Sequence, residues 1–280
     1  MSDRAYRVRV GTSAILLLLL GALATILSVI YTSSVTAFIG LGMIFWGAIL
    51  AYIRPDQSVS ASLLNATANP ALSTLNQTLN ELDYNGKPVY LPPKYLNSPD
   101  ETKIYIPKSK DTPLPTPEQI QNLESQTPSR NPEGLLLTPP GAELARLFEK
   151  TLGTNFTRTD LDYLMKNMPR LMVESLEIAT NLEIVLGTAK PPEPAKDPAP
   201  QEGEGHDKIR VRITDSIYEE TSRETDQMTR IHGSIGCPLT SAIACAIARS
   251  TGRPTIITDE KTSDDGKTKE AEYQTYAEAI

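Results

Sequence analysis

The longest apolar stretch of the chain runs from Val10 to Ile53, 44 residues without a charged side chain. Polar residues interrupt it once, at positions 31–34. One membrane-spanning helix needs about 20 apolar residues. The pattern therefore predicts two membrane-anchoring spans, from Thr12 to Tyr31 and from Val35 to Ile53. A cleaved signal peptide is one alternative, but its apolar core has only about 7–15 residues. A buried core hairpin is the other, but cores rarely need 44 uncharged residues in sequence.

Basic residues flank this stretch on both sides. Arg4, Arg7 and Arg9 precede it and Arg54 follows it, while the central break carries no basic residue. Cytoplasmic flanks of membrane spans carry an excess of Lys and Arg. The sequence therefore predicts a multi-pass protein of the cell membrane with both termini cytoplasmic and the lipid bilayer as a partner.

Four segments follow from the changing pattern. Residues 1–54 are the predicted transmembrane hairpin, and residues 55–85, with leucines at helical spacing, predict a helical stalk. Residues 86–141 hold two short runs rich in Val, Ile and Tyr, which predict strands, and a Pro-rich linker. Residues 142–280 predict an α+β domain.

Two pairs of strands are expected in that last segment. Leu182–Leu186 and Ile209–Ile213 read as partners, separated by residues 188–207, whose prolines and charges predict a disordered insertion. A polar helix from Ser216 to about Arg230 should follow. A second helix should begin at Pro238 and end at Gly252, before a hairpin that turns at residues 264–267.

The predicted fold class is thus α+β, with an N-terminal two-helix transmembrane hairpin followed by a cytoplasmic α+β domain of antiparallel strands. The charge composition of that domain excludes one class of partner. Residues 54–280 contain 33 acidic and 24 basic residues. Because nucleic-acid binding relies on a basic surface, no nucleic-acid partner is predicted.

Cys237 is the sharpest chemical candidate. It stands in a Gly-Cys-Pro sequence at the expected start of a helix, where unpaired N–H groups and the helix dipole favour a thiolate. With His232 before it and Ser241 after it, it forms the predicted ligand-binding set. The alternative is a small buried residue that closes a tight turn. Cys245 lies among Ala and Ile and is expected in the core.

Other chemistry finds little support in the residue pattern. The two cysteines, His206 and His232 do not have zinc-site spacing. No Gly-rich phosphate loop, nucleophile elbow or carboxylate pair is recognisable. No metal, no cofactor and no catalytic residue is therefore predicted.

Three strings carry a family resemblance: residues 233–246 (GSIGCPLTSAIACA), 132–141 (PEGLLLTPPG) and 87–93 (KPVYLPP). On these, the chain resembles, over nearly its whole length, an archaeal family of membrane proteins with two N-terminal transmembrane helices and no established activity. Residues 142–280 also resemble the vinyl-reductase-type domain shared with vesicle-tethering TRAPP subunits. That resemblance implies the order helices, two strands, two helices, two strands, and either a small hydrophobic ligand or scaffold assembly. The further cysteines of its metal-linked versions are absent.

These observations predict a membrane-anchored cytoplasmic protein that binds a small hydrophobic ligand or a protein partner, such as a second copy of itself, without catalysis. A thiol-based redox sensor or enzyme using Cys237 is one alternative. A structural membrane scaffold is the other. A sensor requires a depressed thiol pKa, which separates the first alternative from the other two.

Overall fold

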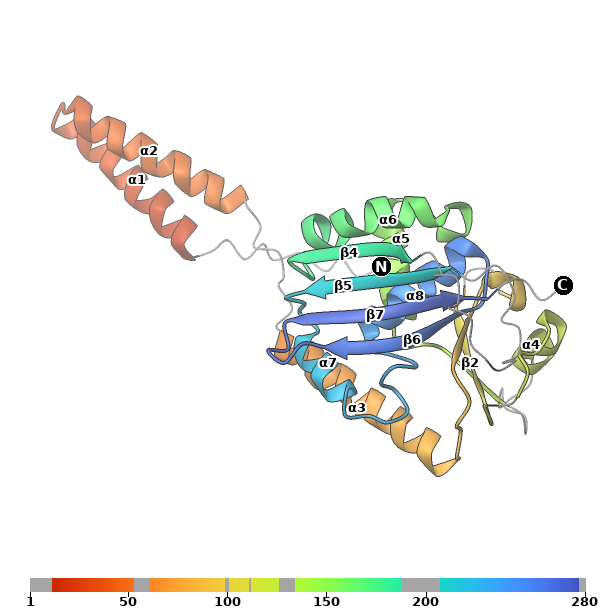
Figure 1. Ribbon diagram of the computed structural model, residues 1–280. Coiled ribbons are helices and arrows are strands. Elements are labelled where there is room, and N and C mark those ends of the chain that lie inside the picture. The colour runs from red at the N-terminus through yellow and green to blue at the C-terminus, as the bar shows by residue number, and fades with distance from the viewer. Residues whose placement is uncertain are drawn as a thin grey trace. The chain divides into compact units, whose positions relative to one another are not determined.

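The computed structural model of the protein describes residues 12–52, 61–98, 101–110, 112–125, 134–187 and 207–276 (Figure 1). Two compact units divide the chain, Met1–Ser60 and Ala61–Ile280. The first holds α1 (Thr12–Ile30) and α2 (Ser34–Tyr52). The helices of the second are α3 (Ala61–Glu81), η1 (Pro93–Tyr95), α4 (Pro117–Glu124), α5 (Ala142–Leu152), η2 (Phe156–Arg158), α6 (Leu161–Arg170), η3 (Leu171–Ser175), α7 (Glu219–Thr225) and α8 (Pro238–Thr251). Its strands are β1 (Val89–Leu91), β2 (Lys103–Pro107), β3 (Gly134–Leu137), β4 (Asn181–Gly187), β5 (Lys208–Thr214), β6 (Thr255–Thr262) and β7 (Thr268–Thr275).

Glycines bring α1 and α2 close together in the first unit. A Cβ on Gly21 would lie 2.8 Å from the carbonyl oxygen of Gly40, and one on Gly47 would lie 2.9 Å from Leu18 Cγ. Only residues without a side chain permit this approach of the two backbones. Apolar side chains on the outside of the hairpin are exposed, among them Phe38 at 83% and Val29 at 76%.

The transmembrane hairpin of the predicted fold class requires a correction. No helix in the described part of the chain is long and apolar enough to cross a membrane. The polar break divides the apolar run into two helices of 19 residues, each about 28 Å long at 1.5 Å per residue, whereas the hydrocarbon core is about 30 Å thick. That finding overturns the spans Thr12–Tyr31 and Val35–Ile53 and the multi-pass cell-membrane localisation with cytoplasmic termini. Ile53 and the flanking arginines lie outside the described residues.

A seven-stranded antiparallel sheet organises the second unit, in the order β3-β2-β1-β6-β7-β5-β4. Helices α5, α6 and α8 cover one face, where the main apolar cluster includes Phe148, Met168 and Ile243. On the other face, α4 covers only the β1–β3 end, through Ile120 and Leu123. The chain is thus α+β with antiparallel strands.

Several predicted elements of this unit are confirmed. Strands β4 and β5 pair along their whole length, from Asn181 opposite Thr214 to Gly187 opposite Lys208. Strands β6 and β7 form the expected hairpin. Helix α8 begins at Pro238, and Gly252 ends it in the left-handed conformation, with φ 63°. The predicted disordered insertion falls almost entirely on residues 188–206, outside the described residues.

The expected stalk and the strand-containing segment 86–141 are parts of the second unit and not separate segments. Helix α3, in the region of the expected stalk, buries Leu72 and Leu79 and lies beside α7 (Figure 1). Strands β1, β2 and β3, from the segment 86–141, extend the same sheet through the pairing of Tyr90 with Thr255. One sheet therefore joins both sequence segments.

Candidate functional site

Cys237 is the N-cap residue of α8, and the loop before it is folded tightly. Gly236 has φ +74°, and a Cβ there would lie 2.3 Å from Thr240 Oγ1 and 3.2 Å from Glu260 Oε1. Only glycine fits that position. The hydroxyl of Thr240 donates a hydrogen bond to Glu260 at 2.6 Å and lies 3.5 Å from Cys237 Sγ.

Glu260 reaches this position because of a β-bulge in β6. The pairing of β6 with β7 shifts between Ile257 and Asp259, so that Glu260 stands opposite Ala271 on the buried face. Without the extra residue, the alternation of the strand would place Asp259 inside and Glu260 outside. The carboxylate is fully buried, and the backbone N–H of Gly233 donates to its second oxygen at 3.3 Å.

Lys269 is the counter-ion of that carboxylate. Its Nζ lies 3.7 Å from Glu260 Oε1 and 2.6 Å from Asp226 Oδ1, and its side chain is 6% exposed. Burial alone would lower the pKa of Lys269, but the charges of the two carboxylates raise it on balance. Burial would likewise raise the pKa of Asp226, and the hydrogen bond from Lys269 holds it below its usual value.

His232 is the last side chain connected to these groups, and its Nδ1 lies 3.1 Å from Asp226 Oδ1. Six side chains therefore connect in sequence, and we refer to them as the polar network: Cys237, Thr240, Glu260, Lys269, Asp226 and His232. One end of the network is the buried thiol. The other end is the half-buried imidazole, whose side chain is 37% exposed.

Ser241 has a different environment. It is fully buried, and its Oγ accepts a hydrogen bond from the backbone N–H of Gly141 at 3.0 Å and lies 3.0 Å from the Tyr90 hydroxyl. Tyr90 also donates to the carbonyl of Ile235. These bonds tie α8 to β1 and to the start of α5. Ser241 lies one turn after Cys237, to whose carbonyl its N–H donates at 2.9 Å, but its hydroxyl bonds Gly141 and Tyr90 and not the side chain of Cys237 or His232.

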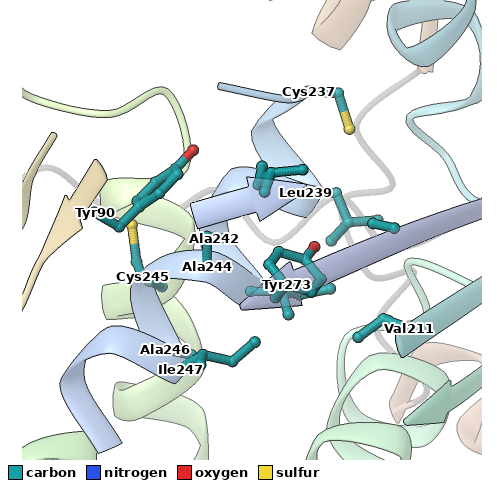
Figure 2. Packing of buried hydrophobic residues seen from close by; sticks show 14 of the residues in the cluster. Tyr90, Val211, Cys237, Leu239, Ala242, Ala244, Cys245, Ala246, Ile247 and Tyr273 are labelled. Atoms are coloured by element: carbon teal, nitrogen blue, oxygen red, sulfur yellow. The ribbon is translucent and has the colours of Figure 1, made fainter. Parts of the chain in front are cut away.

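Both thiols are enclosed by the core. Cys237 is 1% exposed and Cys245 is 0% exposed. Figure 2 shows Cys237 at the start of α8, with Tyr90 and Tyr273 on different sides of the helix. Burial raises the pKa of Cys245 far above its usual value. Cys245 is thus a core residue, as predicted.

An open groove of about 610 Å³ lies at the exposed end of the polar network. It is lined by residues from α3, from the segment before β1, from the end of β2 and just after it, and from the loop before α8. Its apolar lining includes Leu79, Tyr84 and Ile106. Among the described residues, its ionisable lining apart from tyrosines consists of Lys87, Lys110, Arg230 and His232. A second space, beside Ala246 under α6, has only about 10 Å³, room for no more than about one water molecule.

The structure therefore brings His232 and Cys237 to opposite ends of one network, and only His232 lines the groove. Sequence reasoning missed Glu260, Lys269 and Asp226. One signal was available, because Lys269 precedes Ala271 and Tyr273 at alternate positions of a strand. A lysine on the apolar side of such a pattern indicates a buried ion pair. No comparable signal marks Glu260, since nothing in the sequence predicts the bulge.

Comparison with known proteins gives one match. A family model described as a domain of unknown function, DUF7982, matches residues 1–273. No curated protein and no solved structure is similar enough to match. The resemblance to vinyl-reductase-type domains therefore stays a prediction, as does the archaeal origin.

Proposed function

Since the chain belongs to the DUF7982 family, a domain of unknown function, we propose its role from the site itself: it binds a small organic molecule in the groove, without catalysis. The groove's volume of about 610 Å³ carries this proposal. Sites for small molecules typically measure about 300–1,000 Å³ and combine apolar walls with a few polar groups. Leu79, Tyr84 and Ile106 supply the walls, while Lys87 and His232 supply polar groups.

The polar network supports binding rather than catalysis. Glu260, Lys269 and Asp226 satisfy one another, and the carboxylate of Glu260 is fully buried. A catalytic acid or base must come within hydrogen-bond reach of its substrate. Of the network, only His232 lines the groove. The network therefore holds in place the loop before α8 that lines the groove with Thr229, Arg230, His232 and Ser234, which we call the groove-lining loop.

The thiol-based alternative receives less support from the geometry. Reactive cysteines lie in partly exposed, electropositive surroundings. Cys237 is 1% exposed and has the carboxylate of Glu260 near its Thr240 neighbour. The burial of its thiol favours the structural interpretation of Cys237.

A neutral probe tests the groove independently of charge. Isothermal titration of 2-naphthamide into the full chain should show binding that Thr229→Trp weakens, because Thr229 is an exposed residue of the groove lining and the indole would occupy part of the space. The matched control is Ser175→Trp, at an exposed position at the end of η3, and it should bind like the wild type. Equal binding by wild type and Thr229→Trp would place the probe elsewhere and refute the proposal.

A further inference from the structure

The ionisable groups around the groove are unlike those of the whole chain. The protein has a formal net charge of −7, from 27 basic and 34 acidic residues. Yet the described residues that line the groove include Lys87, Lys110, Arg230 and His232 and no Asp or Glu. A positive concavity on an acidic protein concentrates anions at that place.

Lys87 is held at the groove through the backbone next to it. The residue before it, Gly86, donates its N–H to the Pro107 carbonyl at 3.1 Å, and a Cβ on Gly86 would lie 2.5 Å from Pro107. This contact fixes the chain where it enters β1, directly beside Lys87. Lys87 is an exposed residue, and partial desolvation lowers its pKa. No carboxylate of the described residues lies within ion-pair distance of its ammonium group. Its ammonium group is therefore available to a bound anion.

Arg230 is held at the groove by α3. Asn76 accepts a hydrogen bond from its backbone N–H at 2.9 Å, and Asn80 accepts one from its Nε at 2.8 Å. Among the described residues, the carboxylate that pairs with it is Asp83, which is 3.8 Å away and largely exposed. An arginine has five N–H donors, so donors remain for a ligand after these contacts.

His232 adds a fourth basic group with a fixed orientation. Asp226 binds its Nδ1 at 3.1 Å, and Lys269 in turn binds Asp226 at 2.6 Å. A carboxylate partner of this kind sets the orientation of an imidazole ring. The polar network thus positions one wall of the groove.

From this arrangement, and resting on the proposed function, we infer that the ligand is a small organic anion with an apolar body. Its charged oxygens bind Lys87, with Arg230 and His232 at the same groove. Its apolar part packs on Leu79, Tyr84 and Ile106. Lys110 lies on the same groove lining and adds to its positive potential.

A matched pair of probes tests the inference, 2-naphthoate and the neutral 2-naphthamide, titrated calorimetrically into the full chain. Naphthoate should bind about ten-fold more tightly than naphthamide, the ratio expected when one hydrogen bond to a charged group distinguishes them. Lys87→Gln should remove about that factor for naphthoate and leave naphthamide unchanged. Lys166→Gln, which removes a lysine exposed on α6, should leave both affinities as they are.

The outcomes separate this inference from the proposed function. If both probes bind with equal affinity, Thr229→Trp weakens both and Lys87→Gln changes neither, the groove is a ligand site and the anion preference is refuted. If Thr229→Trp weakens neither probe, or neither binds at millimolar concentration, the groove itself is refuted as the site. A naphthoate affinity that falls with added salt, while that of naphthamide does not, supports the anion preference.

Discussion

Lys269→Met removes the only cation between two carboxylates of the polar network. The methionine keeps much of the apolar stem of lysine and takes away the ammonium group, so packing changes little. Glu260, fully buried, and Asp226, 24% exposed, then lose the Nζ that lies 3.7 Å and 2.6 Å from them. The variant therefore measures what an uncompensated charge costs in this core.

The magnitude follows from the burial of each partner. Removing one partner of a buried ion pair typically costs about 3–5 kcal/mol, because the other charge is left without compensation. Glu260 retains its hydrogen bonds from Thr240 and from Gly233 N–H, and Asp226 retains some contact with water. We therefore expect a loss of unfolding free energy near the lower end, about 3 kcal/mol.

Urea denaturation of the full chain measures this loss, and the choice of signal matters. The single tryptophan, Trp46, lies in α2 of the first unit, so its fluorescence does not report the sheet. Tyrosine near-ultraviolet circular dichroism reports the second unit, which buries Tyr90, Tyr105 and Tyr273.

The matched control is Lys261→Met on the adjacent strand. Lys261 pairs with Asp259 at 2.6 Å but is 74% exposed, and exposed pairs contribute about 0–1 kcal/mol. In the Lys269→Met background, Glu260→Gln should recover part of the lost stability by removing the stranded charge. Equal, small losses for Lys269→Met and Lys261→Met would refute the buried network, as would further destabilisation on adding Glu260→Gln.

Three other predictions address the core and its dependence on pH. Ala246→Leu should lower the unfolding free energy by about 1–3 kcal/mol, since the space beside this fully buried residue is only about 10 Å³; an unchanged urea midpoint would mean that the helix is not packed there. Cys237→Ser should cost about 1–3 kcal/mol, because a polar hydroxyl replaces a weakly polar thiol in the core. In the native protein the thiol should resist alkylation by iodoacetamide, and rapid alkylation would restore the sensor hypothesis. The pKa of Asp226 is lowered by folding, so its contribution is complete above the unfolded value of about 3.9 and is lost as the pH falls through the folded value. Asp226→Asn should therefore flatten the acid side of the stability profile measured by urea midpoints, and an unaltered profile would contradict this assignment.

Much of the second unit could be predicted because its local patterns agree with its tertiary structure. Strand β5 alternates strictly between buried and exposed residues, and α8 carries both a proline at its start and a left-handed glycine at its end. In such elements the sequence signal and the packing favour the same conformation. The register of β4 with β5 follows from the same alternation.

Other elements depend on contacts that a local pattern does not contain. The helix expected from Ser216 to about Arg230 is only α7, which ends at Thr225. Beyond it, Asp226 binds Lys269, and Arg230 binds two asparagines of α3, so tertiary contacts hold this stretch as the groove-lining loop. The joining of β1 to β6 was missed for a similar reason, since it rests on one residue pair, Tyr90 with Thr255.

The candidate site was predictable only in part. Gly-Cys-Pro marked the start of α8 correctly, but the burial of Cys237 comes from strands distant in sequence. The groove is formed by residues such as Leu79, Lys87 and Arg230, and more than 140 positions separate Arg230 from the other two. No motif connects them. The positive charge shared by Lys87 and Arg230 becomes visible only when the fold brings these two residues together.

A crystal structure of the full chain with 2-naphthoate tests the central claim, that the groove is the ligand site, most directly. The account predicts a carboxylate oxygen about 2.7–2.9 Å from Lys87 Nζ, the distance of a charge-assisted hydrogen bond, and the naphthyl ring against Tyr84 and Ile106. Probe molecules bound only on the α1–α2 hairpin or on the outer face of the sheet, with the groove empty, would contradict it.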